Sequence, residues 1–219
     1  MDRCFIAIAG NIGVGKSTLT EVLSRELGGK PFFEAVDTNP YLADFYRDMR
    51  AWSFHSQVFF LSQRLRRHYE LMQHSGTVIQ DRTVYEDAEV FARNLYEQGL
   101  MNERDYRVYR QLYEVMRDLV PPPTLVVYLR ASVETLLRRI ALRGCHFEHE
   151  ISAEYLERLN ALYEEWVAGL RLCPVLVVET DGIDFAHRDD DMHEVSRLVL
   201  ARIGEIAAVQ CTRPTARGG

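Results

Sequence analysis

Residues 5–17 read Phe5-Ile6-Ala7-Ile8-Ala9-Gly10-Asn11-Ile12-Gly13-Val14-Gly15-Lys16-Ser17, and this stretch decides the fold. The apolar run at 5–9 predicts a buried strand, and residues 10–17 satisfy the pattern G-x-x-x-x-G-K-[ST]. Such a loop turns backbone N–H groups toward one anion, at the positive end of the helix that Ser17 and Thr18 begin. We therefore predict a nucleoside triphosphate site, in which Lys16 contacts the β- and γ-phosphates and the Ser17 hydroxyl binds Mg²⁺.

Short apolar runs alternate with longer helical patterns along the rest of the chain. The predicted strands are 5–9, 32–33, 77–80, 125–129 and 175–178, and the predicted helices are 17–27, 51–73, 87–98, 103–119, 133–142, 153–170 and 192–207. Short runs without alternation are typical of parallel strands that are buried on both faces. The pattern predicts an α/β protein with a phosphate-loop NTPase-type three-layer fold: an open five-stranded parallel sheet flanked by helices, with an arginine-bearing lid.

Composition limits the partners and the location. The 219 residues carry 26 Lys+Arg and 32 Asp+Glu, a net charge of −6, so no broad basic face is available and we expect no nucleic-acid partner. No apolar window is long enough to cross a membrane, the N-terminus does not read as a secretory signal, and the four cysteines are far apart. We expect a single cytoplasmic domain over residues 1–219, with no membrane association and a mobile tail at 212–219.

Glu34 comes soon after the predicted strand at 32–33. Because the carboxyl ends of parallel strands meet at one edge of a sheet, we expect Glu34 near the γ-phosphate. A carboxylate there would repel an acceptor that is already a phosphate anion, but it could take the proton from an attacking hydroxyl. The position favours an alcohol acceptor. A solvated glutamate at a strand end is the alternative.

Asp81 and Arg82 follow the third predicted strand, where a carboxylate commonly faces the metal in phosphate-loop enzymes. We expect Asp81 to bind Mg²⁺ through water. We expect Arg82 to hold the donor phosphate and to lie against Glu34, keeping that carboxylate ionised and oriented. The alternative is a structural ion pair between Asp81 and Arg82.

Arg139 and Arg143 are four residues apart near the end of a helical pattern, so they share one helical face. When a lid at about 143–151 closes, both could swing onto the triphosphate and stabilise charge in the transition state. Arginines on a solvated helix are common, and that remains the alternative.

Together these segments resemble the deoxynucleoside kinase family, particularly its bacterial deoxyadenosine/deoxyguanosine kinase branch. The resemblance lies in residues 10–18, 33–36, 52–57, 81–87, 139–148 and 184–185. It covers nearly everything before the tail, and the ordered set is far more specific than any one segment. It implies a typically dimeric kinase that transfers phosphate from ATP to a deoxynucleoside, with Mg²⁺.

The resemblance also implies roles for single residues. Glu34 would be the base for the 5′-hydroxyl, and Arg82 would position that hydroxyl and the phosphate. The remaining roles are sugar 3′-hydroxyl contacts by Tyr46 and Glu148, base recognition by Gln57 and Asp87, base stacking by Phe91, and contacts to the ATP adenine by Asp184 and Phe185. Each of these has an ordinary structural alternative, such as a core aromatic, a helix cap or a solvated acid.

Two positions depart from the family pattern. The lid usually carries a third arginine where this chain has Cys145, so one phosphate contact is missing here or is supplied by Arg138 or a more distant residue. Some relatives carry an arginine after the glutamine that reads the base, here Gln57. At that position this chain has Gln63, and Arg64 is adjacent. Base preference is therefore open, and the branch resemblance favours a purine, deoxyadenosine before deoxyguanosine.

Two other functions compete with this one. A nucleoside monophosphate kinase of the thymidylate type shares the loop and a similar Asp-Arg motif, but it has no use for Glu34. A kinase-fold subunit without catalysis, similar to an accessory subunit of a respiratory complex, would have no need of intact Lys16, Ser17 or Asp81.

Overall fold

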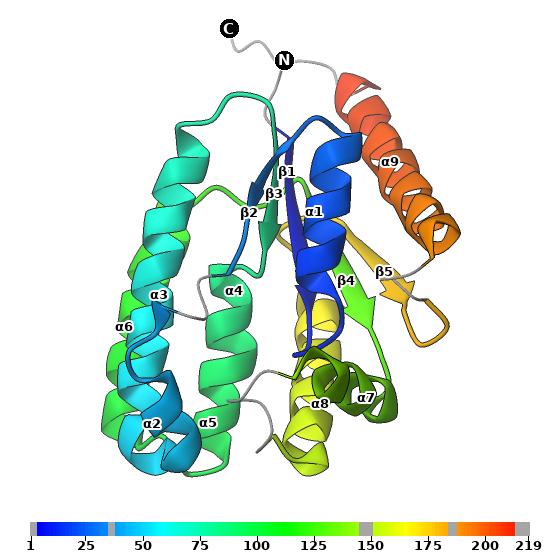
Figure 1. Cartoon of the computed structure of the whole chain (residues 1–219). Helices are drawn as coiled ribbons and strands as arrows, with labels where there is room; N and C mark the ends of the chain where they lie inside the picture. The colour runs from blue at the N-terminus through cyan, green and yellow to red at the C-terminus, as the bar shows by residue number, and fades with distance from the viewer. Residues whose placement is uncertain (1–3, 35–37, 145–150, 184–187, 213–219) are drawn as a thin grey trace, which may run out of the picture.

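A five-stranded parallel sheet forms the centre of the chain in a computed structural model that describes residues 4–34, 38–144, 151–183 and 188–212 (Figure 1). The strands are β1 (Cys4–Gly10), β2 (Lys30–Phe32), β3 (Thr77–Asp81), β4 (Leu125–Arg130) and β5 (Val175–Glu179). Their order is β2-β3-β1-β4-β5, and every neighbouring pair is parallel. The predicted parallel α/β sheet is thus confirmed.

Helices cover both faces of the sheet. They are α1 (Lys16–Glu26), α2 (Leu42–Arg47), α3 (Met49–Met72), α4 (Val84–Glu86), the π-helix η2 (Asp87–Ala92), α5 (Arg93–Glu97), α6 (Glu103–Leu119), α7 (Val133–Arg143), α8 (Ala153–Gly169) and α9 (Asp189–Thr212). Helices α1 and α9 pack on one face (Figure 1). The other face holds α8 and the continuous helical stretch from α4 to α5, with α3 and α6 farther out.

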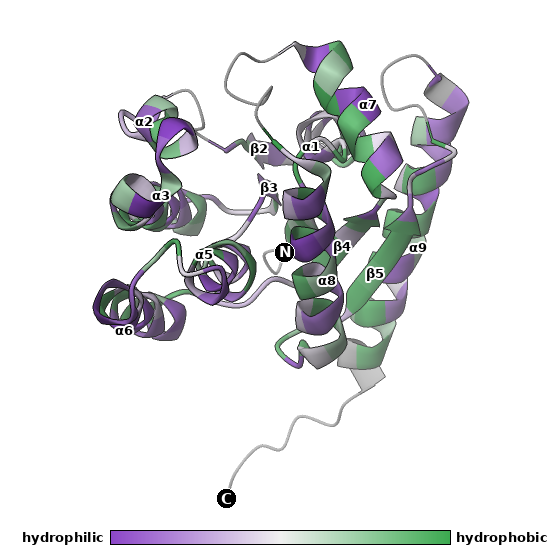
Figure 2. Cartoon of the chain, turned by 90° about the horizontal axis from the view of Figure 1, so that it is seen from below, coloured by the Kyte–Doolittle hydropathy of each residue, from purple (hydrophilic) through white to green (hydrophobic). Residues whose placement is uncertain are grey.

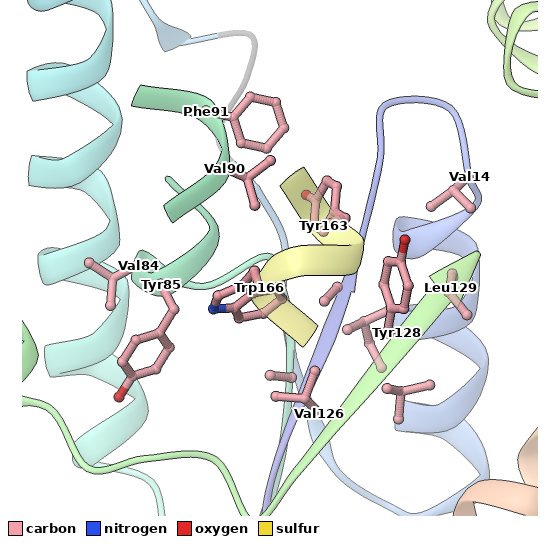
Figure 3. Packing of buried hydrophobic residues seen from close by; sticks show 14 of the residues in the cluster. Val14, Val84, Tyr85, Val90, Phe91, Val126, Tyr128, Leu129, Tyr163 and Trp166 are labelled. Carbon is pink, nitrogen blue, oxygen red and sulfur yellow. The ribbon is translucent and has the colours of Figure 1, made fainter. Parts of the chain in front are cut away.

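Apolar residues of the central strands form the main core. Residues 6–9 of β1 are fully buried, as expected for a middle strand covered on both faces. In Figure 3, Tyr163 of α8 lies between Phe91 and Tyr128. Its ring meets Phe91 edge-on at a centroid distance of 6.2 Å and stacks on Tyr128 at 5.6 Å. This contact joins α8 to both η2 and the sheet.

Several element boundaries differ from the sequence prediction. The helix predicted from residue 87 begins at Val84, because Thr83 and Glu86 form a capping box there. Helix α9 includes Asp189–Asp191 and runs to Thr212, so residue 212, predicted as the first residue of the tail, is helical. Helix α2 was not predicted, since a six-residue helix is too short to show a period; its Leu42 and Phe45 side chains are buried in a second, smaller core cluster.

The predicted lid and tail fall largely on residues that the structure does not describe. Most of the predicted lid and all but the first residue of the predicted tail lie outside the described residues. Among the helices that are described, none has both the length and the apolar character that crossing a bilayer requires.

Candidate active site

The ends of three neighbouring strands bring the predicted residues to one edge of the sheet. Gly10 ends β1, Asp81 ends β3, and Glu34 follows the end of β2 by two residues. Because β2, β3 and β1 are adjacent and parallel, these positions converge near the start of α1. The carboxyl edge of an open parallel sheet is where ligands bind in this fold class.

The phosphate loop has the backbone that its glycines allow. Gly10 adopts φ +144°, and a Cβ there would lie 2.6 Å from the carbonyl oxygen of Leu129, so only glycine fits. Gly15, with φ 106°, precedes the first residue of α1. The Lys16 Nζ donates to the Asn11 carbonyl oxygen at 2.9 Å, so the lysine side chain folds back over its own loop. The loop that we predict to hold the phosphates thus has the positive φ angles at Gly10 and Gly15 that glycine permits.

Other loop residues face inward to the protein. The Asn11 amide donates to the Leu156 carbonyl at 3.0 Å and to Asn160 Oδ1 at 2.8 Å, both on α8. Val14 is fully buried. Of the remaining predicted loop residues, Ile12 packs partly buried against the core, and Gly13 and Thr18 are half-buried. These contacts hold the shape of the loop.

Burial, with the nearby charge of Arg82, lowers the pKa of Lys16 to about 8. The free protein therefore loses the lysine proton as the pH rises through about 8, and a bound triphosphate has to restore it. We expect the KM for the triphosphate to rise about tenfold per pH unit above that value, while the KM for the acceptor changes little. Steady-state kinetics between about pH 6.5 and 9.5 would check this, and a flat donor KM would contradict it.

Ser17 and Asp81 could hold a metal ion. The Ser17 hydroxyl donates to Asp81 Oδ2 at 2.5 Å, and Asp81 Oδ1 is buried without a hydrogen-bond partner in the described part of the chain. A hydroxyl and a carboxylate are oxygen ligands of the kind that Mg²⁺ prefers, and Mg²⁺ usually takes only one or two protein ligands beside phosphates and waters. No cluster of three or more His, Cys, Asp or Glu suited to a metal occurs among the described residues. The pair fits the predicted Mg²⁺.

Glu34 is held between two buried arginines. Its Oε1 accepts from Arg64 Nη2 at 2.6 Å and lies 3.4 Å from Arg82 Nη1. Burial by itself would raise the pKa of Glu34, but the charges of Arg82, Arg64 and Lys16 outweigh it and lower the pKa to about 2. The predicted contact between Arg82 and Glu34 is therefore present, and the carboxylate is ionised at every physiological pH.

Arg64 is a site residue that the sequence analysis missed. It is 3% exposed, and its Nε donates to Asp87 Oδ2 at 2.9 Å. The sequence analysis placed Gln63 at the family's arginine position and named Arg64 only as its neighbour, whereas Arg64 is the side chain that contacts Glu34 and Asp87. A usable signal existed: Gln57 and Arg64 are seven residues apart on α3, two helical turns, and so share a face.

Four residues that the sequence analysis assigned to the substrate lie on the helices that form or border this cluster. Phe91 and Asp87 lie one π-helical turn apart in η2, and π-helical turns are frequent at functional sites. The guanidinium carbon of Arg82 lies 4.1 Å from the centre of the Phe91 ring, so a stacking base has to use the other face or displace the arginine. Gln57 is buried on α3, and the half-buried Tyr46 on α2 packs against both core clusters.

Arg139 and Arg143 differ in their surroundings. The Arg139 guanidinium donates to the carbonyl oxygens of Val14, Thr180 and Ile183 at 2.6–3.0 Å, which ties the phosphate loop to the segment after β5. Arg143 ends α7 and is exposed. A swing onto a triphosphate would therefore cost Arg139 several hydrogen bonds, whereas Arg143 is accessible. Cys145, Glu148, Asp184 and Phe185 lie outside the described residues.

Buried charges at the site are nearly balanced before any ligand binds. The cations are Lys16, Arg64 and Arg82, and the carboxylates are Glu34, Asp81, Glu86 and Asp87. Each arginine already contacts a carboxylate at 2.6–3.4 Å. Among the described buried residues, no cation is left over for a phosphate on the acceptor, and an uncompensated buried charge is costly. The site suits a neutral acceptor beside one triphosphate.

A parallel sheet with a phosphate loop after its central strand β1, and with carboxylates after β3 and β2, the next two strands on one side of it, defines a phosphate-loop phosphotransferase. Residues 6–203 match the family described as deoxynucleoside kinase, and the chain belongs to this family. It therefore has deoxynucleoside kinase activity. The resemblance seen in the sequence is confirmed.

Relatives of this chain match most of its length and most of their own. A deoxyadenosine/deoxycytidine kinase of Bacillus subtilis strain 168 is 38% identical over 192 residues, which cover 87% of this chain and 88% of that protein. A deoxyadenosine kinase of Dictyostelium discoideum is 38% identical over 177 residues, 80% of this chain and 72% of that protein. The structure of M. mycoides deoxyadenosine kinase with the products dCMP and a flexible dCDP has a TM-score of 0.78 at 30% identity, covering 90% and 99% of the two chains.

Proposed function

We propose that this kinase transfers the γ-phosphoryl group of ATP, with Mg²⁺, to the 5′-hydroxyl of a purine 2′-deoxynucleoside. The observation that carries the proposal is the position of Glu34: an ionised carboxylate at the sheet edge that carries the phosphate loop, with both neighbouring arginines already paired. Such a site can orient and deprotonate an alcohol, and it disfavours a second phosphate.

The donor side of the proposal uses the loop. The backbone of residues 10–18 and the Lys16 ammonium hold the triphosphate, and Arg143 adds charge from the end of α7. Ser17 and Asp81 hold Mg²⁺, which would neutralise charge on the phosphates. The proposed contacts of Asp184 and Phe185 with adenine remain predictions, as does a direct phosphate contact by Arg139.

On the acceptor side, Glu34 takes the 5′-hydroxyl proton and Arg82 positions that hydroxyl. Phosphoryl transfer proceeds through a loose transition state, so positioning and charge contribute most, and a base contributes about 10²–10⁴-fold. We assign the base edge to Gln57, Asp87 and Arg64, with Phe91 against its face. Contacts of Tyr46 and Glu148 with the sugar 3′-hydroxyl remain predictions.

The two competing functions fit the protein less well. A thymidylate-type kinase needs free cations around the acceptor phosphate, and the described buried arginines of this site are paired. A subunit without catalysis has no reason to keep Lys16, Ser17 and Asp81 assembled as they are here. Family membership and the intact site both favour a catalytic deoxynucleoside kinase.

Base preference is tested by offering the four natural deoxynucleosides, each with ATP and Mg²⁺, and measuring kcat/KM. We expect deoxyadenosine to rank first and deoxyguanosine second, because the sequence resembles the bacterial deoxyadenosine/deoxyguanosine kinase branch. The similar kinases of B. subtilis and D. discoideum both bear deoxyadenosine in their names. A pyrimidine ranking first would overturn the purine proposal. Phosphorylation of deoxyadenosine monophosphate in preference to deoxyadenosine would overturn the acceptor class.

We also propose that two copies of the chain associate through α3 and α6. These helices lie side by side in Figures 1 and 2, and each carries exposed apolar residues at helical spacing. They are Leu65, Tyr69 and Met72 on α3, and Val108, Leu112, Val115 and Leu119 on α6. Such stripes are suited to a self-complementary interface.

The Val115→Glu variant tests this interface, because Val115 is 62% exposed in the single chain and its replacement should not disturb the fold. We expect the wild-type chain to sediment as a dimer and the variant as a monomer. Ala201→Glu, which adds the same charge to an exposed position on α9, should remain dimeric. A monomeric wild type at micromolar concentration would contradict the proposal.

The cytoplasmic location stays a prediction of the sequence.

A further inference from the structure

Glu86 is a buried acid for which the proposed reaction has no use. It is fully buried, and both of its carboxylate oxygens accept hydrogen bonds. Oε1 accepts from the Thr83 backbone N–H at 2.9 Å, and Oε2 accepts from the Gly10 N–H at 3.3 Å and from the Tyr163 hydroxyl at 2.9 Å. One side chain thus joins three segments that are far apart in the sequence.

Each of these segments matters to the site. Gly10 is the first glycine of the phosphate loop and adopts a conformation that only glycine tolerates well. Thr83 follows Arg82, whose φ of +62° is strained for a residue with a side chain and has to be maintained by its surroundings. Glu86 therefore fixes the backbone on the donor side and on the acceptor side at once.

Helix α8 supports the same loop from its other side. Tyr163 reaches Glu86, and on the same face of α8 Leu156 and Asn160 receive the Asn11 amide. Tyr163 itself is wedged between Phe91 and Tyr128 (Figure 3). Residue 11 is thus hydrogen-bonded directly to α8, and residue 10 is linked to α8 through Glu86.

We propose that Glu86 is a positioning residue: it holds the first glycine of the phosphate loop in register with Arg82, and Tyr163 orients it from α8. This rests on the proposed binding of ATP by the loop. A carboxylate suits the task because it only accepts hydrogen bonds, and the two backbone groups it meets only donate. A glutamine of the same size would place an NH₂ group against one of them.

Glu86→Gln tests the proposal most directly. Its amide oxygen can still cap Thr83, and the Tyr163 hydroxyl can turn to accept from the NH₂ group, which leaves the Gly10 N–H facing a donor. A buried donor without an acceptor is costly. We expect about a tenfold rise in the donor KM, with the deoxynucleoside KM changed less than about twofold.

Three further variants complete the experiment: Tyr163→Phe, the double variant Glu86→Gln/Tyr163→Phe, and a control. Tyr163→Phe should raise the donor KM about two- to threefold, and the double variant should be no worse than Glu86→Gln alone, since Tyr163 acts through Glu86. The control is Glu89→Gln, on the same helical stretch, which removes an outer ion pair with Arg110 and should leave both KM values unchanged. Melting temperatures of all variants show whether each is folded at the assay temperature.

Binding of inorganic tripolyphosphate separates this inference from the proposed function, because it probes the loop without a base or a transfer step. Weaker tripolyphosphate binding by Glu86→Gln than by the wild type, by about the same factor as the donor KM, supports the inference even where ATP is not the donor. Equal tripolyphosphate binding by the two proteins, equal rises of both KM values, or additive effects of the two substitutions would overturn it. Failure of the wild type alone to use ATP would overturn the proposed donor instead.

Discussion

Glu34→Gln is expected to lower kcat by about 10²–10⁴-fold while the KM for the deoxynucleoside stays within a few-fold of the wild-type value. Glutamine keeps the size of the side chain and can still accept a hydrogen bond from Arg64 or Arg82, so the acceptor pocket should keep its shape. It cannot take a proton from the 5′-hydroxyl. Initial rates at saturating donor and varied deoxynucleoside measure the two constants separately.

A control has to remove a comparable ion pair elsewhere. Glu97→Gln breaks a contact of 2.6 Å with Arg93 on the surface of α5 and should leave kcat unchanged. Near-wild-type kcat in Glu34→Gln with normal substrate affinity would show that another residue is the base.

The lowered pKa of Glu34, about 2, provides a second readout. A carboxyl whose pKa is lowered on folding stabilises the folded protein above its ordinary pKa of 4.5, and that stabilisation is lost as the pH falls from about 4.5 toward 2. The acid limb of activity in the wild type should therefore not arise from Glu34. Any limb seen near pH 5–6 should persist in Glu34→Gln.

Local signals in the sequence were enough to predict the strands of the sheet and the positions of several residues of the candidate site. The strands were predictable because each is a short apolar run between helical patterns, and the loop because its glycines and lysine stand in one contiguous motif. Glu34 and Asp81 followed from the rule that parallel strands end at one edge. None of these inferences needed a contact between distant residues.

The parts that were missed depend on such contacts. Asn11 belongs to the phosphate motif, yet its side chain bonds to Asn160 on a helix almost 150 positions later, as the separation of 149 shows. The sequence analysis gave Glu86 no role of its own, because its bonds to Gly10 and Tyr163 span 76 and 77 positions. The π-helical turn of η2 likewise leaves no period that a sequence pattern reveals. Arg64 could have been found from its helical spacing to Gln57, but the sequence analysis named it only as the neighbour of Gln63.

Arg64→Met is expected to destabilise the protein by about 3–5 kcal/mol, because it leaves two carboxylates buried without their nearest cation. Arg64 donates to Glu34 at 2.6 Å and to Asp87 at 2.9 Å, and all three side chains are at most 11% exposed. Burial already raises the pKa of Asp87 against the opposing charge of Arg64. Without that charge, Asp87 should take up a proton or the fold should loosen. Urea unfolding measures the loss in the free energy of unfolding.

The double variant Arg64→Met/Asp87→Asn distinguishes a charge effect from a packing effect. If the uncompensated Asp87 carboxylate is the main cost, the double variant should be more stable than Arg64→Met alone, although Asp87→Asn by itself breaks the same pair. Arg66→Met, at an exposed neighbouring position on α3, should have little effect. Additive losses from the two substitutions would show that Arg64 and Asp87 do not act as a pair. The double variant could regain stability and still have low activity. That remaining loss would reflect the absence of Arg64 beside Glu34 and in base recognition, because Glu34 would still lack its closest arginine.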